Sequence, residues 1–561
     1  QVAYRVVAAS APDADETLWD SGRIESDQST QVEYGGPALQ SGQRIFWRVT
    51  VWDDAGTDVT SAVAWWEMGL LKRDDWQAEW VAAPLAGGAY TPNPAPYVRK
   101  EFGLRGDVAT ARLYITSVGL YEAWLNGKRV GEALLTPGWT DYTRRVQYQV
   151  YDVAELVRDG QNALGVILGD GWAVGHVAWA ERQRYADRPR LLAQLVVRYS
   201  DGSSDTIASD GNWKVSTGGL LESDMLMGES FDARREPAGW NAPGFADDRW
   251  WPVEVVADTG AALVATNGPT IRRHEELAAT ILGDRREHQN RRWVFDLGQN
   301  MVGWVRLRVR GQAGRTIRLR YAEVLNPDGS LYLDNLRSAR NVDYYTAAGD
   351  DEEVWEPRFT FHGFRYVEVF GLNGSATPDM LTGIVVHSDT PTSGMFTTSD
   401  PLINQLQHNI EWGQKGNFVD VPTDCPQRDE RLGWTGDAQV FVRTAAFNKD
   451  VAAFFTKWAQ DVEDAQAPNG AYPSVAPNPG VSNADGGPAW ADAGIICPWT
   501  MYLCYGDRRI LERFYPSMQR FAEFLHGTSR NGIRNYADYT GWHGYGDWLA
   551  LDGSSTNFGG T

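Results

Sequence analysis

The residues best suited to chemistry lie together in residues 423–437, TDCPQRDERLGWTGD, which hold four acidic side chains and two arginines in fifteen positions. Pro422 and Pro426 oppose helix formation, while Gly433 and Gly436 allow backbone angles and close approaches that other residues resist. The sequence therefore predicts a shaped loop ahead of a helix, which is a common place for positioned catalytic groups.

Carboxyl groups beside an indole suggest acid–base chemistry. Cys425, Leu432 and Trp434 are residue types that prefer burial, so the loop is expected to be partly buried. Partial burial raises the pKa of a carboxyl group, and a nearby arginine keeps a second carboxylate ionised. One protonated and one ionised carboxyl group are what glycoside hydrolysis requires. The alternative is a solvated loop whose charges only pair with one another.

The same stretch resembles the signature of bacterial α-L-rhamnosidases, glycoside hydrolase family 78, in DCPQR (424–428) and ERLGWTGD (430–437). The resemblance covers essentially the whole chain. Segments similar to other parts of the family are residues 18–29, 125–153, 295–309 and 361–371. By motif position, the resemblance implies that Glu430 is the general acid. It also implies that the rhamnose subsite is lined by Asp424, Arg428, Trp434 and Asp437.

Two downstream segments, GGPAWADAG (486–494) and GYGDWLALD (544–552), also look like family segments. They offer Trp490 and Trp548 as aromatic walls, and Asp492 and Asp547 as polar contacts; helix-end packing with a capping aspartate is the alternative. The family inverts the anomeric configuration, which needs a second carboxylate roughly 6.5–9.5 Å from the acid to activate water. The resemblance places this general base in a downstream Glu that is not in this sequence.

The elements that must position these residues change from β to α along the chain. Residues 44–53 alternate apolar and polar side chains as a half-buried strand does. Residues 113–132 read as two strands joined at Asn126-Gly127, a dipeptide suited to a type I′ turn. In residues 304–324 the apolar face of a predicted strand carries Val305, Leu307 and Val309. A second predicted strand repeats this alternation with Ile317, Leu319 and Tyr321. Short strands with turns at this spacing indicate β-sandwiches.

After residue 390 the period of the apolar residues becomes helical. Asp400 and Pro401 predict a helix start, and an apolar helix face is then formed by Leu402, Ile403, Leu406 and Ile410. Further helices are predicted at about 437–447, after Asp450, across residues 490–506 despite Pro498, and after Asp507.

The predicted fold class is therefore a multidomain chain with N-terminal β-sandwich and jelly-roll domains, followed by an (α/α)6-barrel catalytic domain that is expected to be incomplete at the C-terminus. The expected domains are a fibronectin-type-III-like β domain at 1–72, which is expected to be trimmed at its N-terminus, and a jelly-roll β-sandwich at 73–256. A further β-sandwich domain is expected at 257–390, and the first part of the barrel at 391–561.

Composition narrows the classes of partner. The 25 Trp and 23 Tyr fit carbohydrate recognition, because indole faces stack on the C–H faces of sugars, with core packing as the alternative for part of them. A net charge of -21 argues against nucleic acid and anionic membranes as partners. The chain has three Cys without CxxC spacing and eight scattered His without HExxH, so neither a disulfide framework, a metal nor a cofactor is predicted.

The predicted function is an inverting glycoside hydrolase that releases terminal α-L-rhamnose from plant glycosides or polysaccharide side chains. Its expected partner is a rhamnosylated small molecule or oligosaccharide, and a homodimer is left open. The first residues, QVAYRVVAAS, contain neither an initiator Met nor a signal-peptide pattern, so cytoplasmic and secreted locations both stay open. Two other functions remain in view: a non-catalytic carbohydrate-binding protein, and an (α/α)6 glycosidase or lyase of different specificity.

Overall fold

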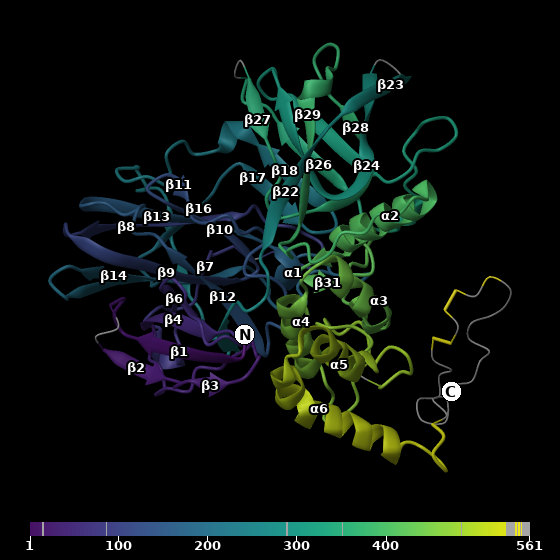
Figure 1. Ribbon diagram of the computed structural model, residues 1–561. Helices are drawn as coiled ribbons and strands as arrows, with labels where there is room; N and C mark the ends of the chain where they lie inside the picture. Colours follow the sequence, from purple (N-terminus) through teal and green to yellow (C-terminus); the bar gives the residue numbers. More distant parts are fainter. Residues whose placement is uncertain are drawn as a thin grey trace. The chain divides into compact units, whose positions relative to one another are not determined.

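The computed structural model describes residues 1–13, 16–85, 87–287, 290–349, 352–483, 485–534, 545–546, 548–549 and 551. The chain divides into two compact units (Figure 1), one formed by Gln1–Gln77 with Leu263–Ala265 and the other by Ala78–Ala262 with Thr266–Thr561. The predicted order, sheet domains first and helices after residue 390, is confirmed.

The first unit is built on one sheet with strand order β2-β1-β4-β5, in which β3 also pairs with β1 and β6 with β4. Its strands are β1 Ala3–Ala9, β2 Thr17–Asp20, β3 Ile24–Glu25, β4 Arg44–Trp52, β5 Asp58–Thr60 and β6 Ala64–Glu67. The alternating pattern at residues 44–53 forms β4, as predicted.

The second unit begins with two sheets that share one core. One sheet has the order β11-β10-β13-β8-β16-β19, and the other contains β20-β7-β14-β9-β12, with β15 pairing with β14. Their strands are β7 Val81–Ala82, β8 Pro96–Leu104, β9 Val108–Val118, β10 Leu120–Leu125, β11 Lys128–Arg129, β12 Arg145–Asp152, β13 Gly160–Gly169, β14 Arg190–Tyr199, β15 Ser204–Ala208, β16 Lys214–Thr217, β19 Trp251–Pro252 and β20 Glu254–Val255. The strand β21 Ala262–Ala265 comes next in the chain, and its residues Leu263–Ala265 belong to the first unit. Val98, Leu164 and Leu191 are among the residues from both sheets that fill the space between them.

The segment 113–132 confirms one prediction and corrects another. Asn126 and Gly127 have φ angles of 54° and 82° and join β10 to β11 in a tight turn, as expected. The segment is not one long strand before that turn, because Gly119, with φ 127°, ends β9 and starts β10. Since β9 and β10 lie in different sheets, this glycine carries the chain across the sandwich.

A ten-stranded sheet follows, with the order β17-β18-β26-β25-β28-β24-β29-β22, and β23 and β27 pair with β24. Its strands are β17 Leu220–Asp224, β18 Gly228–Asp232, β22 Ile271–Ala278, β23 Thr280–Glu287, β24 Asn290–Val309, β25 Thr316–Ala322, β26 Val342–Thr346, β27 Glu353–Trp355, β28 His362–Phe370 and β29 Leu381–Ser388. Short 3-10 helices accompany the sheets at η1 Arg73–Asp75, η2 Ala233–Arg235, η3 Asp334–Leu336 and η4 Pro378–Met380.

Two features of this sheet bear on the predictions. The faces predicted in residues 304–324 are correct, since Val305, Leu307, Ile317 and Leu319 are all buried. Strands β17 and β18 lie before residue 256 but belong to this sheet, because β18 pairs in parallel with β26. A boundary at residue 256 therefore does not separate the two sheet regions completely.

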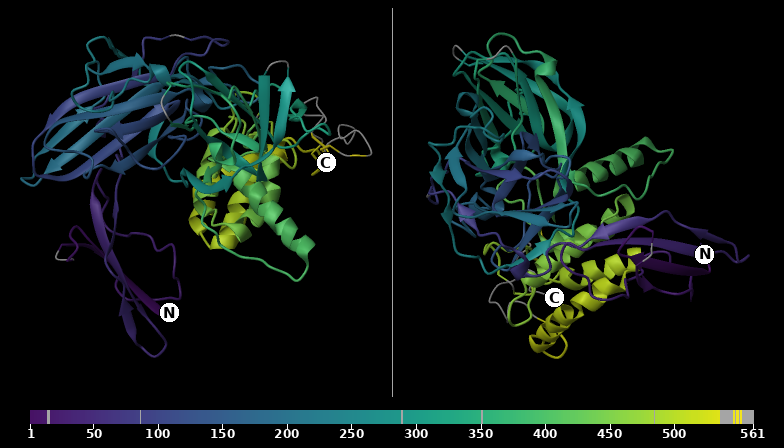
Figure 2. Two further views of the ribbon diagram at one scale, coloured as in Figure 1. Left: turned by 90° about the horizontal axis from the view of Figure 1, so that it is seen from above. Right: turned by 90° about the vertical axis from the view of Figure 1, so that its left-hand side faces the viewer.

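The helices after residue 390 group together (Figure 2). They are α2 Pro401–Asn417, α3 Thr435–Asn448, α4 Ala452–Asp464, α5 Ala493–Tyr505 and α6 Arg508–Gly527, preceded in the sheet region by α1 Gly171–Val174. The predicted caps are present: Asp400 accepts a hydrogen bond from the Leu402 amide, and Asp507 from the Arg509 amide. The short strands β30 Phe418–Val419 and β31 Val421–Pro422 form a small ribbon after α2.

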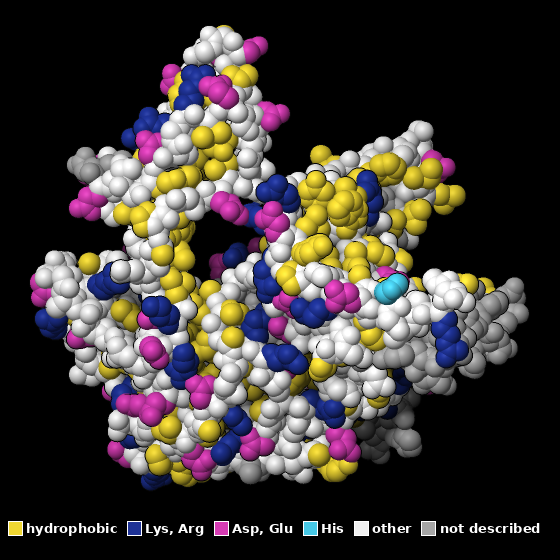
Figure 3. Space-filling view, turned by 90° about the horizontal axis from the view of Figure 1, so that it is seen from below, with side chains coloured by type: hydrophobic (Ala, Val, Ile, Leu, Met, Phe, Trp, Pro, Cys, Tyr) yellow, Lys and Arg dark blue, Asp and Glu magenta, His cyan; other side chains and the backbone are white. Residues whose placement is uncertain are grey.

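The predicted apolar face of α2 does not point into a core. Leu402 is 78% exposed, and Ile403 and Leu406 are exposed as well, although α2 lies against β24 and β29. Val440 and Phe447 on α3 are also exposed. Hydrophobic side chains gather on the face shown in Figure 3. Among the described residues, no element covers these five side chains.

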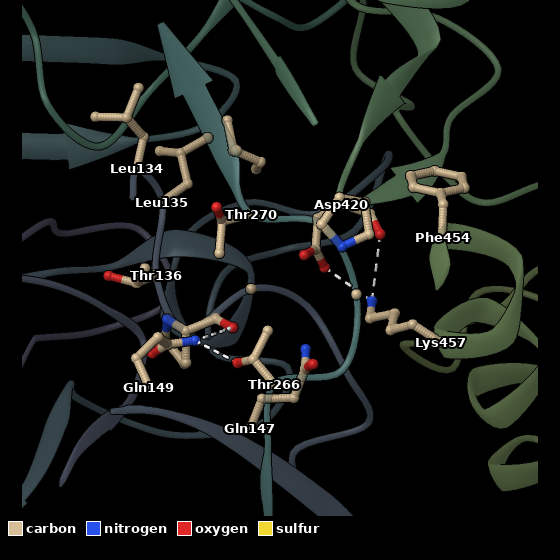
Figure 4. Close-up of a pocket in the computed structure, with 15 residues that line it drawn as sticks. Leu134, Leu135, Thr136, Gln147, Gln149, Thr266, Thr270, Asp420, Phe454 and Lys457 are labelled. Carbon is tan, nitrogen blue, oxygen red and sulfur yellow. Dashed lines mark hydrogen bonds and ion pairs between the residues drawn. The ribbon is translucent and has the colours of Figure 1, made fainter. Parts of the chain in front are cut away.

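Buried ion pairs join α4 to the sheets of the second unit. Lys457 Nζ lies 2.8 Å from Asp420 Oδ2 (Figure 4). It also donates to the Trp139 carbonyl oxygen at 2.6 Å. Gly138 precedes this contact, and a Cβ there would lie 2.5 Å from Asp420 Oδ1, so only glycine fits. Arg145 pairs with Asp461 on the same helix at 2.6 Å. These contacts hold the helices against the loop that follows β11.

Among the described residues, no helix combines the length and the apolar content needed to cross a membrane.

Candidate active site

The predicted catalytic loop runs from β31 to α3 and is folded back on itself. The Asp424 amide donates to the Leu432 carbonyl oxygen at 3.0 Å, and the Leu432 amide donates to Asp424 Oδ1 at 2.9 Å. Trp434 then caps α3 with extended backbone angles. The loop is therefore a closed turn, as the prolines and glycines predicted, and it brings its two ends together.

Arg431 anchors the loop on the sheets of the second unit. The side chain is buried, and its guanidinium donates to the main-chain oxygens of Met225 and Phe361 at 2.7 and 2.6 Å and to Asn341 Oδ1 at 2.8 Å. Its φ of 57° lies in the left-handed region, which non-glycine residues rarely adopt. Burial lowers the pKa of Arg431 to about 10, despite nearby acidic groups. These contacts fix the residue directly after Glu430.

Glu430 is held by three donors. Its Oε2 accepts from Arg428 Nε at 2.9 Å and from Arg337 Nη2 at 2.7 Å, while its Oε1 accepts from Trp434 Nε1 at 2.9 Å. The predicted neighbour Trp434 is thus in contact, but it offers its N–H rather than its apolar face. All three donors fix the orientation of the carboxyl group. The side chain is only 12% exposed, so these contacts are shielded from bulk water.

Two other predicted carboxyl groups share this environment. Burial, together with the nearby Glu430 charge, raises the pKa of Asp424 to about 6, although Arg428 lies 2.9 Å from Asp424 Oδ2. Asp437 remains accessible in a hollow, where partial burial and Glu430 raise its pKa as well. Both line a cavity of about 230 Å³ whose other walls include Phe418 and Phe441. The structure therefore brings Asp424, Asp437 and Glu430 into one electrostatic group.

Arg337 is a site residue that the sequence analysis missed. It lies in the segment after η3, has a φ of 56°, and also donates through Nε to Asp429 Oδ1 at 2.5 Å. The Ser338 amide donates to the other oxygen of Asp429 at 3.1 Å. Asp429, which also had no predicted role, thus positions Arg337 against Glu430. The only sequence signal was a second arginine-rich polar stretch, LDNLRSAR, far from the motif.

An aromatic cluster adjoins the charged group. The Tyr545 ring lies with its centroid 5.8 Å from that of Trp434, 4.2 Å from Trp490 and 5.8 Å from Trp548. Trp490 also packs on the first turn of α3, where a Cβ on Gly436 would meet it at 2.7 Å. The structure thus brings the three predicted tryptophans together around Tyr545, which was not predicted. Trp434 belongs to both groups.

The two remaining predicted polar residues differ. Asp492 accepts a hydrogen bond from the Ala489 amide at 2.8 Å, so its carboxylate closes the turn before α5. This contact is the helix-end role considered as the alternative. Asp547 lies outside the described residues.

Asp424, Cys425 and Glu430 could be considered as metal ligands, since one donor atom from each lies within 4.8 Å of the others. Both carboxylates, however, already accept from Arg428, and a guanidinium competes with a cation at the same oxygens. Burial also raises the pKa of the Cys425 thiol, and a protonated thiol is a poor ligand. The arrangement suits guanidinium contacts better than a metal.

Four family models match successive parts of the chain. The Rha78A-like N-terminal immunoglobulin domain matches residues 1–72, and the α-L-rhamnosidase N-terminal domain matches residues 106–275. The bacterial α-L-rhamnosidase concanavalin-like domain matches residues 286–387, and the bacterial α-L-rhamnosidase six-hairpin glycosidase domain matches residues 391–560.

Curated relatives agree with these matches. An α-L-rhamnosidase from Streptomyces avermitilis is 38% identical over 98% of this chain and 69% of its own length. An α-L-rhamnosidase from Formosa agariphila is 40% identical over 97% of this chain and 60% of its own length. The chain thus spans between three fifths and seven tenths of these relatives.

The fold is similar to that of solved α-L-rhamnosidases. The Streptomyces avermitilis enzyme complexed with L-rhamnose superposes with a TM-score of 0.93 at 36% identity, over 99% of this chain and 70% of that one. The native Aspergillus terreus enzyme gives a TM-score of 0.88 at 38% identity, over 93% of this chain and 61% of that one. The chain therefore belongs to the bacterial α-L-rhamnosidases, glycoside hydrolase family 78, as its DCPQR and ERLGWTGD motifs predicted.

Proposed function

We propose that this protein hydrolyses terminal α-L-rhamnosyl groups from rhamnosylated small molecules or oligosaccharides, with Glu430 as the general acid. The observation that supports this most directly is the placement of Glu430 between two guanidinium groups and the indole N–H of Trp434, beside an aromatic cluster. A carboxyl group with fixed orientation next to aromatic walls is the arrangement that sugar hydrolysis needs.

Glu430 must free one of the two acceptor positions on Oε2, where Arg428 and Arg337 both donate, to deliver a proton to the departing glycosidic oxygen. Arg337 is the donor best placed to leave, because its side chain is 46% exposed whereas that of Arg428 is 33% exposed. Loss of that contact would leave Trp434 and Arg428 to hold the carboxyl group. The carboxylates of Asp424 and Asp437 would stabilise the positive charge that develops on the sugar ring.

The rhamnose ring itself is assigned to the neighbourhood of Glu430, where the charged group adjoins the aromatic cluster at Trp434. Trp434, Trp490 and Trp548 present flat rings, while Asp424 and Arg428 present hydrogen-bonding groups for sugar hydroxyls. The net charge of -21 suits a neutral substrate rather than an anionic one. Inversion also requires a second carboxylate that activates water.

We also infer a four-part division at 1–72, 73–256, 257–390 and 391–561, with one amendment. Residues 220–232 cross from the second part into the sheet of the third. The family models that match residues 1–72 and 391–560 support the first and last parts.

The test is release of free L-rhamnose from 4-nitrophenyl α-L-rhamnoside by the full chain, followed by proton NMR of the first sugar formed to establish its anomer. Glu430→Gln keeps the shape of the side chain and removes the acid, so hydrolysis is expected to fall by about 10²–10⁴-fold. Asn373→Ala, in an exposed turn, is the matched control. Unchanged hydrolysis in Glu430→Gln would overturn the assignment.

A further inference from the structure

A second cavity lies on the sheet side of α2, separate from the one lined by Asp424 and Asp437. It measures about 290 Å³, and its walls come from β24, the end of β25, the second half of α2 and Pro426. That volume is close to the lower end of small-molecule sites. The two cavities share Gly413 and Asn417, so they meet at the last turn of α2.

The lining of this cavity is polar but carries one aromatic ring. Asn300, Asn409 and Asn417 contribute amides, Glu323 a carboxyl group and Trp412 an indole. Asn300 Nδ2 donates to Glu323 Oε1 at 3.0 Å, which orients both groups on the cavity wall. Within the described part of the chain, Asn417 Oδ1 is buried without a hydrogen-bond partner. This oxygen can therefore accept a hydrogen bond from a ligand at the turn that the two cavities share.

The cavity is linked to Glu430 by a short segment. Asn335 Nδ2 lies 3.5 Å from Glu323 Oε2, and Arg337, two residues later, donates to Glu430 Oε2. Two residues of extended chain span at most about 7 Å, so the cavity wall and the proposed acid lie at the two ends of a short stretch. The positive charge of Arg428, which bonds Glu430, also acts on Glu323.

We propose that this cavity binds the leaving-group side of the substrate, as a hydroxylated ring attached to the scissile oxygen. The proposal rests on the proposed function, because it takes Glu430 as the point where the bond breaks. Amides and a carboxyl group suit several hydroxyls, and an indole suits the apolar face of a sugar ring. The carboxyl group of Glu323 disfavours a phosphate or another anion at the same place.

The kinetic test compares two substrates in the full chain. Asn300→Ala and Glu323→Gln are each expected to lower kcat/KM for an α-L-rhamnosyl-glucose disaccharide by about tenfold, the effect of losing one well-placed hydrogen bond. Hydrolysis of 4-nitrophenyl α-L-rhamnoside, whose leaving group has no hydroxyls to bind, is expected to change less than about threefold in the same variants. Asn373→Ala serves as the control on the same sheet region.

A binding test separates this proposal from the proposed function. Calorimetric titration of the Glu430→Gln chain is expected to show tighter binding of the disaccharide than of free L-rhamnose, and Asn300→Ala in that background is expected to remove the difference. Hydrolysis that falls equally on both substrates, or a disaccharide that binds no better than rhamnose, overturns the cavity assignment. A chain that hydrolyses neither substrate but keeps an Asn300-dependent disaccharide preference overturns the function and supports the cavity.

Discussion

Replacing Arg431 with alanine is expected to destabilise the loop and the helices by about 3 kcal/mol. Its guanidinium makes three bonds of 2.8 Å or less to Met225, Phe361 and Asn341, and bonds from a charged donor contribute about 1.5–3 kcal/mol each. Burial opposes the charge, since it lowers the pKa to about 10, which offsets roughly 3 kcal/mol of that gain. The bonds outweigh the cost of burying the charge by about 3 kcal/mol.

The assay is differential scanning calorimetry, which resolves the several transitions expected of a multidomain chain. At about 2–4 °C per kcal/mol, the affected transition is expected about 6–12 °C lower in Arg431→Ala. Arg431→Gly loses the same bonds, but glycine adopts a φ of 57° without strain. Its free energy of unfolding is therefore expected to exceed that of the alanine variant by about 1 kcal/mol. Arg508, in an exposed pair on α6, is the control, and Arg508→Ala is expected to cost less than about 0.5 kcal/mol. A transition within about 2 °C of the original in Arg431→Ala would refute this account of the loop.

Three further changes test the electrostatics. Arg337→Gln is expected to lower kcat/KM about tenfold, because it removes one of the three donors that orient the Glu430 carboxyl group; an unchanged kcat/KM would contradict a role for this contact. The pKa of Asp424 is raised to about 6, so the native state holds this proton more tightly than the unfolded chain does, and stability from this group falls as pH rises from about 4 to 6. Asp424→Asn is therefore expected to gain stability relative to the original chain across that window, by at most about 3 kcal/mol in melting experiments, and a constant difference would refute the shift. Lys457→Met leaves Asp420 without its buried cation and Asp461 with Arg145 alone, and it is expected to cost about 3–5 kcal/mol by calorimetry, whereas a loss below about 1 kcal/mol would show that the Lys457 pairs contribute little.

Local signals made much of the fold predictable. The Asn126-Gly127 turn, the alternation in β24 and β25, and the caps at Asp400 and Asp507 depend on neighbours within a few residues, and the structure has them where they were expected. The charged loop was predictable for the same reason. Prolines and glycines restrict the backbone whatever the tertiary context.

Contacts between distant segments could not be predicted in this way. Arg337 reaches Glu430 across 93 residues, and nothing in LDNLRSAR indicates that the backbone at Arg337 turns to a φ of 56°. The transfer of β17 and β18 into the ten-stranded sheet depends on parallel pairing with β26. The face of α2 with Leu402 and Leu406 shows that a correct local prediction can still leave the tertiary contact unknown. Helical periodicity identifies an apolar face, but it does not say what covers that face.

The anchoring of Arg431 has a consequence for how such chains can be recombined. Its acceptors come from Met225 near β18, Asn341 before β26 and Phe361 before β28, all outside the helical region. A helical region transplanted onto foreign sheets would carry a buried guanidinium with no oxygens to receive it, one residue from the proposed acid. When domains are exchanged between relatives, residues 220–232 and the ten-stranded sheet should therefore be transferred together with the helices as one unit.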